Sequence, residues 1–331
     1  MSRNINFVLV LSALVLFLVG GLYLGSGTTV PLAPENYAVC ALSMDEIIKS
    51  GQGDVYNFDG VTDFDEPVLH YLAEYSVNGD TLSAPVLETV PADLRDEQND
   101  STLQSQAWEI FTDLIPAQDR QMVAQFNVFT DGYSNTLAAV DQTKQDLSLW
   151  MLEVDIADLE DKDALIFTMI HEYAHLLTLN ASQVIPDPDT VKDPYNLELQ
   201  RMKAATCDTY YTGTGCSQAD SYIQAFYTRF WADINDEWVA IDELQYGTDD
   251  FVPYYNGLYN FYLANQDQFV GDYAVTHPAE DIAESFTHFV FSPKPVGNSI
   301  KDQKIAFFYE YPELVQLREN ILNGACSLDY E

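Results

Sequence analysis

Apolar residues recur every three or four positions between residues 164 and 180, which is the spacing of a helix with a buried face. Asp161 and Asp163 stand at the start of this run and Asn180 ends it, as helix capping and the helix dipole favour. The pattern therefore predicts a helix over 164–180. Its apolar positions are Leu165, Ile166, Met169, Ile170, Tyr173, Leu176 and Leu177.

Residues 273–291 show a second pattern of the same kind. Pro278 suits the first turn of a helix, where its missing N–H group costs little. Glu280 and Glu284 lie four positions apart, so they share one face of a helix that is otherwise apolar. The apolar positions are Ala279, Ile282, Ala283, Phe286, Phe289 and Val290.

The stretch before the first helix has a mixed pattern. We expect a β-hairpin around residues 78–80, which read Asn-Gly-Asp, and a helix over 101–114 that stops near Pro116. Alternating or strand-forming residues predict strands over 121–130 and 147–155. The second strand is our candidate for the edge of the sheet, where an extended peptide can pair.

The region after the first helix predicts a mainly helical half. Three prolines and several aspartates over 183–200 are typical of a surface loop. Aromatic-rich helical patterns fill 218–268, and 301–322 predicts one or two further helices. We assign the aromatic residues of the middle segment to the core of a helical subdomain: Tyr227, Phe230, Trp231, Tyr259 and Phe261.

Three aspartates in the 183–200 segment suggest a calcium site as one alternative. Asp187, Asp189 and Asp193 supply oxygen ligands of the type that calcium prefers. The segment lacks the spacing of an EF-hand, however, so a solvated loop is the simpler interpretation.

The first predicted helix carries a chemical motif. His171 and His175 are four residues apart and can point at one metal ion, while Glu172 is rotated by about 100° around the helix. This is the HExxH pattern of zinc peptidases, in which the glutamate acts as general base on a zinc-activated water. The chain holds only five histidines, so a chance origin of the pattern is the weaker reading. Two histidines still need a third ligand to hold zinc.

The third ligand does not follow the metzincin spacing, because Thr178 and Ala181 occupy the places of the required glycine and histidine. Glu280 and Glu284 are the better candidates, since one carboxylate can bind the metal while the other accepts a hydrogen bond from a ligating imidazole. Paired acids on a helix are often merely solvated, but burial is costly for unpaired carboxylates on an apolar helix.

The two blocks together resemble a known family. The HExxH motif, followed by Tyr273, Glu280, Glu284 and Phe286 in the pattern Y-x6-E-x3-E-x-F, is similar to the gluzincin arrangement of the anthrax lethal factor catalytic domain and related bacterial zinc-binding metallopeptidases. The resemblance covers about 30 residues, and Glu280 follows His175 by 105 residues, far more than in lethal factor.

The resemblance implies a role for each matching residue. His171, His175 and Glu280 are the expected zinc ligands, and Glu172 is the expected general base. Glu284 is expected to accept a hydrogen bond from a ligating histidine, and His171 is the preferred partner. Tyr273 matches the tyrosine whose hydroxyl group steadies the oxyanion. His277 and His288 are the alternatives to Glu280, but His277 precedes a proline and His288 lies two turns along the helix.

The N-terminal end carries an uncharged apolar run over residues 7–24, with Arg3 as the one basic residue before it. Such a run is a long signal-peptide core or a membrane anchor near the minimum spanning length. Under both interpretations the rest of the chain is exported from the cytoplasm. The charge bias favours a cytoplasmic N-terminus, and we expect an uncleaved anchor over a secreted form.

The charge balance limits the partners. A formal net charge of −38, from 14 basic and 52 acidic residues, argues against nucleic acid or an anionic membrane surface. The expected partner is a protein or peptide substrate, with membrane contact only through residues 7–24. A salt-rich environment would favour the same surface.

Four cysteines in an exported chain suggest two disulfides. Cys207 and Cys216 enclose a short turn-rich segment, and Cys40 and Cys326 would then join the beginning of the folded part to its end. A structural zinc site is the weaker alternative, because the spacings do not match and no histidines accompany these cysteines.

The combined expectation is an α+β, zincin-like metallopeptidase with a small mixed sheet, an active-site helix and a mainly helical C-terminal half. We divide the chain into a signal peptide or anchor (1–27), a mixed N-terminal region packed on the catalytic unit (28–100), and a catalytic domain (101–331) with a helical insertion at about 185–268. The expected activity is zinc-dependent endopeptidase cleavage outside the cytoplasm. The alternatives are an exported, non-catalytic metal-binding or adhesion protein and a zinc amidase acting on cell-wall peptide.

Overall fold

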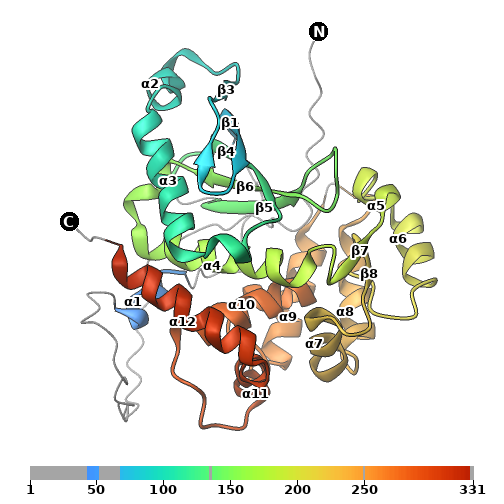
Figure 1. Cartoon of the computed structure of the whole chain (residues 1–331). Helices are drawn as coiled ribbons and strands as arrows, with labels where there is room; N and C mark the ends of the chain where they lie inside the picture. Colours follow the sequence, from blue (N-terminus) through green and yellow to red (C-terminus); the bar gives the residue numbers. More distant parts are fainter. Residues whose placement is uncertain (1–42, 52–67, 134–135, 249, 329–331) are drawn as a thin grey trace.

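A small mixed sheet and one central helix organise the computed structural model, which describes residues 43–51, 68–133, 136–248 and 250–328 (Figure 1). The sheet has the strand order β2-β1-β4-β6-β5, and β3 pairs with β1 beside β2. Strands β4 and β6 are parallel, whereas β1 and β5 run antiparallel to their neighbours. The strands are β1 (His70–Asn78), β2 (Thr81–Leu82), β3 (Val86–Leu87), β4 (Val123–Thr130), β5 (Ala138–Gln142) and β6 (Trp150–Asp155).

Helices make up most of the remaining described chain, and those that follow β6 form the C-terminal half. The first three are α1 (Met44–Gly51), α2 (Arg95–Gln98) and α3 (Ser101–Leu114). The later ones are α4 (Lys162–Leu179), α5 (Pro188–Lys192), α6 (Leu197–Ala204), α7 (Tyr222–Phe230), α8 (Asn235–Asp242), α9 (Val252–Ala264), α10 (Pro278–Phe291), α11 (Ile300–Phe307) and α12 (Pro312–Ser327). This is an α+β architecture with a small mixed sheet, as the sequence predicted.

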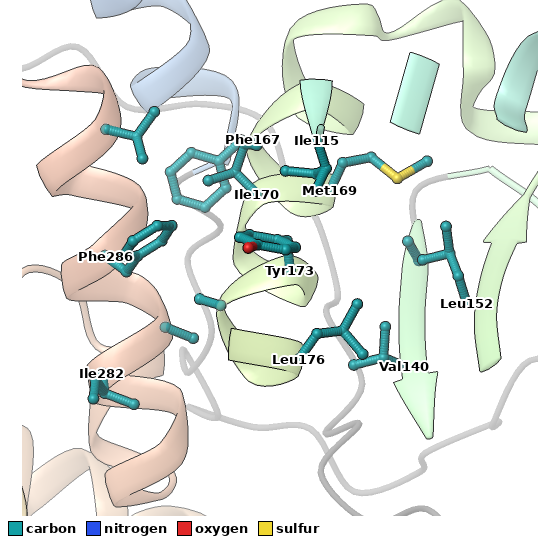
Figure 2. Packing of buried hydrophobic residues seen from close by; sticks show 14 of the residues in the cluster. Ile115, Val140, Leu152, Phe167, Met169, Ile170, Tyr173, Leu176, Ile282 and Phe286 are labelled. Atoms are coloured by element: carbon teal, nitrogen blue, oxygen red, sulfur yellow. The ribbon is translucent and has the colours of Figure 1, made fainter. Parts of the chain in front are cut away.

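The central helix α4 lies between the sheet and α10. Figure 2 shows Leu176 directed toward Val140 on the sheet, and Tyr173 on the side of α10 near Phe286. The rings of Tyr173 and Phe286 are 6.4 Å apart, and both side chains are almost fully buried. Because α4 is apolar nearly all round, it can be covered by the sheet on one side and by α10 on the other.

The predicted hairpin joins β1 to β2 through a two-residue turn. Asn78 pairs with Thr81, and Gly79 has a φ of 63°, a backbone conformation that favours glycine. The buried side chain of Arg120 donates to the carbonyl oxygen of Gly79 at 2.8 Å. The helix over 101–114 and the strands within 121–130 and 147–155 are also confirmed.

One strand prediction was wrong in its placement. The segment 147–155 contains β6, which lies between β4 and β5 in the interior of the sheet. The strand at that end of the sheet is β5, which the sequence analysis did not find. Its residues Ala138, Ala139 and Asp141 belong to types that are depleted in strands, so its strand form depends on pairing with β6 and packing on α4.

The interpretation of 183–200 as a loop was also wrong in part. A small second sheet joins β7 (Val184–Pro186) to β8 (Gly215–Ser217), and α5 begins at Pro188. Asp187 caps α5 by accepting from the N–H of Asp189 at 3.0 Å. Proline at the first turn of a helix is favourable, so this residue starts a helix here and does not exclude one.

The helices predicted within 218–268 are α7, α8 and α9, and the tail forms α11 and α12. Of the aromatic residues assigned to this core, Phe230, Trp231 and Phe261 are buried, and Tyr227 is partly buried against the core as a whole. Tyr259 is exposed. A single core connects β1, α4, α10 and α12. No helix among the described residues has the length and hydrophobicity to cross a membrane, and the apolar run over 7–24 lies outside them.

Candidate metal centre

Helix α4 presents the HExxH residues in the middle of its length. The carboxylate of Asp161 accepts from the N–H of Ala164 at 3.1 Å and caps the start of the helix. At its other end, the side-chain amide of Asn180 donates to the carbonyl oxygen of Leu176 at 2.8 Å. These contacts satisfy backbone groups that a helix leaves unpaired at its ends. The predicted helix is therefore confirmed, and it begins at Lys162, two residues before the predicted start.

Helix α10 presents the second block and is capped by a histidine. His277 has an extended backbone, with φ −162° and ψ 150°, and its Nδ1 atom accepts from the N–H of Ala279 at 3.0 Å. Burial lowers the pKa of His277 to about 4, although Glu280 opposes this shift. The neutral ring can therefore accept the capping hydrogen bond at pH 7.

The two helices bring three predicted ligands to one point. His171 Nε2 lies 2.9 Å from Glu280 Oε2 and 3.1 Å from His175 Nε2. His175 Nε2 lies 3.3 Å from the same Glu280 oxygen. All three side chains are buried, with exposed fractions of 4% for each histidine and 2% for the glutamate. The three atoms form a nearly equilateral triangle.

The remaining predicted partner, Glu284, lies on the far side of the first imidazole. Its Oε1 atom is 2.9 Å from His171 Nδ1. Each nitrogen of this ring therefore faces a different carboxylate, one from each of two adjacent turns of α10. Burial lowers the pKa of His171, but Glu280 and Glu284 outweigh it and hold the pKa well above its usual value.

The donor set fits a metal ion. Zinc bonds of 2.0 to 2.1 Å in tetrahedral geometry place ligand atoms about 3.3 Å apart, close to the separations seen here. The buried Glu280 Oε1 and His175 Nδ1 atoms have no hydrogen-bond partner within the described part of the chain. Burying two carboxylates beside two imidazoles leaves negative charge that a cation would compensate. The His171, Glu172 and His175 ligand atoms, all within 4.8 Å of one another, can also hold a metal ion.

Glu172 differs from the other acidic residues of the site because it is only half-buried. Burial raises its pKa to about 7, against the opposing effects of His175, His171 and the backbone N–H of Val140 on β5. A carboxylate with a pKa near the ambient pH is suited to accept and return a proton. The edge strand β5 therefore borders the side of the site where Glu172 lies.

Tyr273 lies in a short 3-10 turn, Tyr273–Val275, directly before α10. Its ring centroid is 5.7 Å from that of His171, with an angle of 52° between the planes. The indole N–H of Trp238 on α8 donates to the carbonyl oxygen of Val275 at 2.9 Å and fixes this turn. Sequence analysis did not identify Trp238, because only the fold brings α8 to this turn.

The two alternative histidines have other contacts. His277 caps α10, and its ring packs against that of Trp238 at 5.3 Å. His288 is buried one turn beyond Glu284, with its ring 6.4 Å from that of Phe167. The three atoms that converge near one point come from His171, His175 and Glu280.

The aspartates of the proposed calcium site have protein partners. Lys203 Nζ lies 2.6 Å from an Asp187 oxygen and 2.9 Å from an Asp189 oxygen. Asp193 accepts from the side-chain amide of Asn196 at 3.0 Å. A lysine ammonium group thus lies between two of these carboxylates.

The predicted disulfide between Cys207 and Cys216 is present, with a Cα–Cα distance of 5.6 Å. It encloses the turn that leads into β8. Cys326 is also disulfide-bonded, and Cys40, the partner predicted for it, lies outside the described residues.

Comparison with known proteins gives no match to this chain, whether to a protein-family model, a curated protein or a solved structure. The resemblance to gluzincins therefore rests on the motif residues alone. The functional assignment depends on what these side chains can do chemically in the positions they occupy.

Proposed function

We propose that this chain is a zinc-dependent endopeptidase of zincin-like architecture that acts outside the cytoplasm. The observation that carries the proposal is the convergence of His171 Nε2, His175 Nε2 and Glu280 Oε2 within 2.9 to 3.3 Å of one another. Two imidazoles and one carboxylate are the protein ligands of several catalytic zinc sites, in which the fourth position is open.

Zinc bound by these three residues would lower the pKa of a water molecule and polarise the substrate carbonyl group. The protein contributes the orientation of each ligand. Glu284 accepts a hydrogen bond from the Nδ1–H group of His171, which leaves the Nε2 lone pair directed at the metal position. Helix α10 thus supplies both a ligand and the group that orients another ligand.

Glu172 supplies the proton transfers. Its carboxylate takes a proton from water as the oxygen attacks the peptide carbonyl, and it then gives that proton to the departing amine. A pKa raised to about 7 allows both directions of transfer near neutral pH. We assign to Tyr273, whose ring lies 5.7 Å from that of His171, the role of donating a hydrogen bond from its hydroxyl group to the developing oxyanion.

The edge of β5 with which no described strand pairs is the expected substrate platform. The backbone N–H of Thr143 donates to the carbonyl oxygen of Leu149, and the backbone N–H of Asp155 donates to that of Leu137. Because Leu137 and Thr143 flank β5, the register makes the odd-numbered residues of β5 the ones hydrogen-bonded to β6. In an antiparallel ladder the alternate residues turn their backbone groups away from the partner strand. The N–H and C=O groups of Val140 therefore face the open edge, where an extended peptide can add a strand beside Glu172.

A non-catalytic metal-binding protein explains less of the site. A structural metal site is typically closed by four protein ligands and has no use for a half-buried glutamate outside the ligand triangle. Glu172 stands in that position, and burial brings its pKa near 7. In a catalytic site this glutamate would act as the general base.

The test combines metal analysis with a cleavage assay on a broad protein substrate. The purified chain should hold about one zinc ion and cleave the substrate, and chelation should stop the cleavage. Glu172→Gln should keep the zinc and lose at least about 100-fold in kcat, the lower range of general-base effects. Near-normal cleavage by this variant would remove the general-base assignment, and a parent chain that binds no zinc would remove the proposal.

A further inference from the structure

A fully buried ion pair lies directly behind the metal-binding helix. Asp281 on α10 and Lys304 on α11 both have an exposed fraction of 0%, and Lys304 Nζ lies 2.6 Å from Asp281 Oδ2. The indole N–H of Trp231 donates to the same oxygen at 2.7 Å. The ammonium group also lies 3.9 Å from the centroid of the Phe269 ring. Three segments of the chain thus meet at one carboxylate oxygen.

Stability alone gives a weak reason for this pair. Removing both charges from water costs several kcal/mol per ion, and apolar residues of similar volume often stabilise a protein equally well or better. A lysine inside a cage of aromatic rings, which include Phe226, Trp231 and Phe269, stands where an apolar side chain would pack. Unlike apolar packing, a hydrogen-bonded ion pair is directional, because its energy depends on the placement of specific atoms.

The orientation of the Asp281 side chain affects the metal site because Asp281 is the neighbour of Glu280 on α10. Successive residues of a helix project about 100° apart. Glu280 and Glu284 face the histidines of α4, while Asp281 faces Trp231 and Lys304 on another side of α10. The bonds to Asp281 therefore oppose rotation of α10 about its own axis.

The apolar contacts along α10 give little control over such a rotation. Every residue of the helix is buried, and the hydrophobic contacts made by Ile282, Phe286 and Phe289 are not directional. With side-chain tips about 5 to 6 Å from a helix axis, a rotation of about 10° moves a carboxylate by about 1 Å. A metal site tolerates only about 0.5 Å of such error.

We propose that the Asp281–Lys304 pair, with Trp231, is a positioning device that sets the rotation of α10 and so aims Glu280 and Glu284 at the metal ion. The inference rests on the proposed zinc site and goes beyond it, since none of these three residues touches the metal or the substrate. The affinity of the site for zinc then depends on groups on the opposite side of the helix.

The test removes both charges together. In the full chain, Asp281→Leu combined with Lys304→Met leaves no unpaired buried charge, although the indole N–H of Trp231 loses its acceptor. We therefore expect the melting temperature to fall by no more than roughly a few degrees. Zinc affinity, measured by competition with a chelating dye, should fall about 10 to 100-fold, the range found for groups that orient ligands. Cobalt in place of zinc should show an altered visible absorption spectrum, which reports ligand geometry independently of catalysis.

Ser285→Ala is the matched control. Ser285 lies one turn beyond Asp281 on the same side of α10, is fully buried, and its hydroxyl oxygen has no hydrogen-bond partner within the described residues. This variant should bind zinc as the parent does. Trp231→Phe removes the donor to Asp281 and leaves a small cavity in place of the larger indole ring, so it should lower the melting temperature by roughly a few degrees and weaken zinc binding several-fold.

Two outcomes separate the inference from the proposed function. A parent that binds no zinc argues against the metal site itself. A parent that binds zinc, while a folded double variant and Trp231→Phe both bind it equally well, overturns the positioning role and leaves the peptidase proposal intact. If the double variant does not fold, the result for Trp231→Phe decides alone.

Discussion

Glu284 Oε1 lies 2.9 Å from His171 Nδ1, although 113 residues separate the two in the chain. This contact joins α10 to α4 on the side of the imidazole that faces away from the predicted metal position. The other nitrogen of the same ring lies 2.9 Å from Glu280 Oε2. The two glutamates are one turn apart on α10, so the two nitrogens of a single histidine ring contact successive turns of that helix.

The division of roles between these glutamates predicts unequal losses. Glu280→Ala removes a ligand and should abolish tight zinc binding. Glu284→Ala leaves the three ligand atoms and removes only the acceptor for His171, so zinc affinity should fall about 10 to 100-fold. Equilibrium competition against a chelating dye measures both losses on the same scale.

His277→Ala and His288→Ala are the controls for this comparison. Both histidines are contacted by other groups, the first as the cap of α10 and the second in packing against Phe167. Each variant is expected to lose some stability but to bind zinc more tightly than Glu280→Ala. A greater loss of metal in either histidine variant would contradict the assignment of Glu280.

The sequence was sufficient for the two helices of the site because local and global signals agree there. Helix α4 has a long apolar pattern with Asp161 and Asn180 at its ends, and α10 begins at a proline. The fixed geometry of a helix places His171 and His175, four residues apart, on one face of α4. The choice of Glu280 over Glu284 as the third ligand came from the resemblance to gluzincins. The packing of α10 against α4 follows from their apolar faces.

The sequence was not sufficient for features that depend on distant partners. Strand β5 has few strand-forming residues and exists through its pairing with β6. Lys304 reads as a solvated residue of a polar helix, and only the fold shows that it is buried against Asp281. In 183–200 the local signals were present, but proline was read as a helix breaker where it begins α5.

The edge strand allows a test of substrate pairing that spares the metal. Val140→Pro removes an N–H group that faces the open edge, and it removes no ladder bond to β6. Cleavage of extended peptides should fall at least about 10-fold. KM should rise because main-chain hydrogen bonds to the peptide are lost, and kcat should also fall because the same N–H group is a hydrogen-bond partner of Glu172. The zinc content should stay near that of the parent.

Val140→Ala is the appropriate comparison for this variant. It loses part of the side-chain packing against Leu176 but keeps the backbone N–H group. Kinetics on one peptide series should therefore rank the parent and Val140→Ala together, well above Val140→Pro. Equal KM values for all three proteins would argue against strand addition at β5.

Asp242, the last residue of α8, is a half-buried acid outside the metal site. Its Oδ1 atom accepts from the side-chain amide of Gln245 at 2.6 Å. Burial raises the pKa of Asp242 to about 7, against the lowering effect of this hydrogen bond. No ion pair to this carboxylate occurs among the residues that the structure describes. The fold therefore disfavours the charged form of this side chain.

The raised pKa of Asp242 makes part of the stability depend on pH. Below its ordinary pKa of about 4 the acid is neutral in both states, and the burial has no charge cost. Between about pH 4 and pH 7 the unfolded chain releases the proton while the folded chain retains it, so stability falls as the pH rises.

Asp242→Asn should remove this loss and gain about 2 to 4 kcal/mol relative to the parent at pH 8, but little at pH 4. Urea unfolding of both proteins across this range gives the difference, and Asp233→Asn, at an exposed position just before α8, should show none. A gain that is equal at pH 4 and pH 8 would contradict the charge explanation, because an amide that simply packed better would stabilise the fold at every pH.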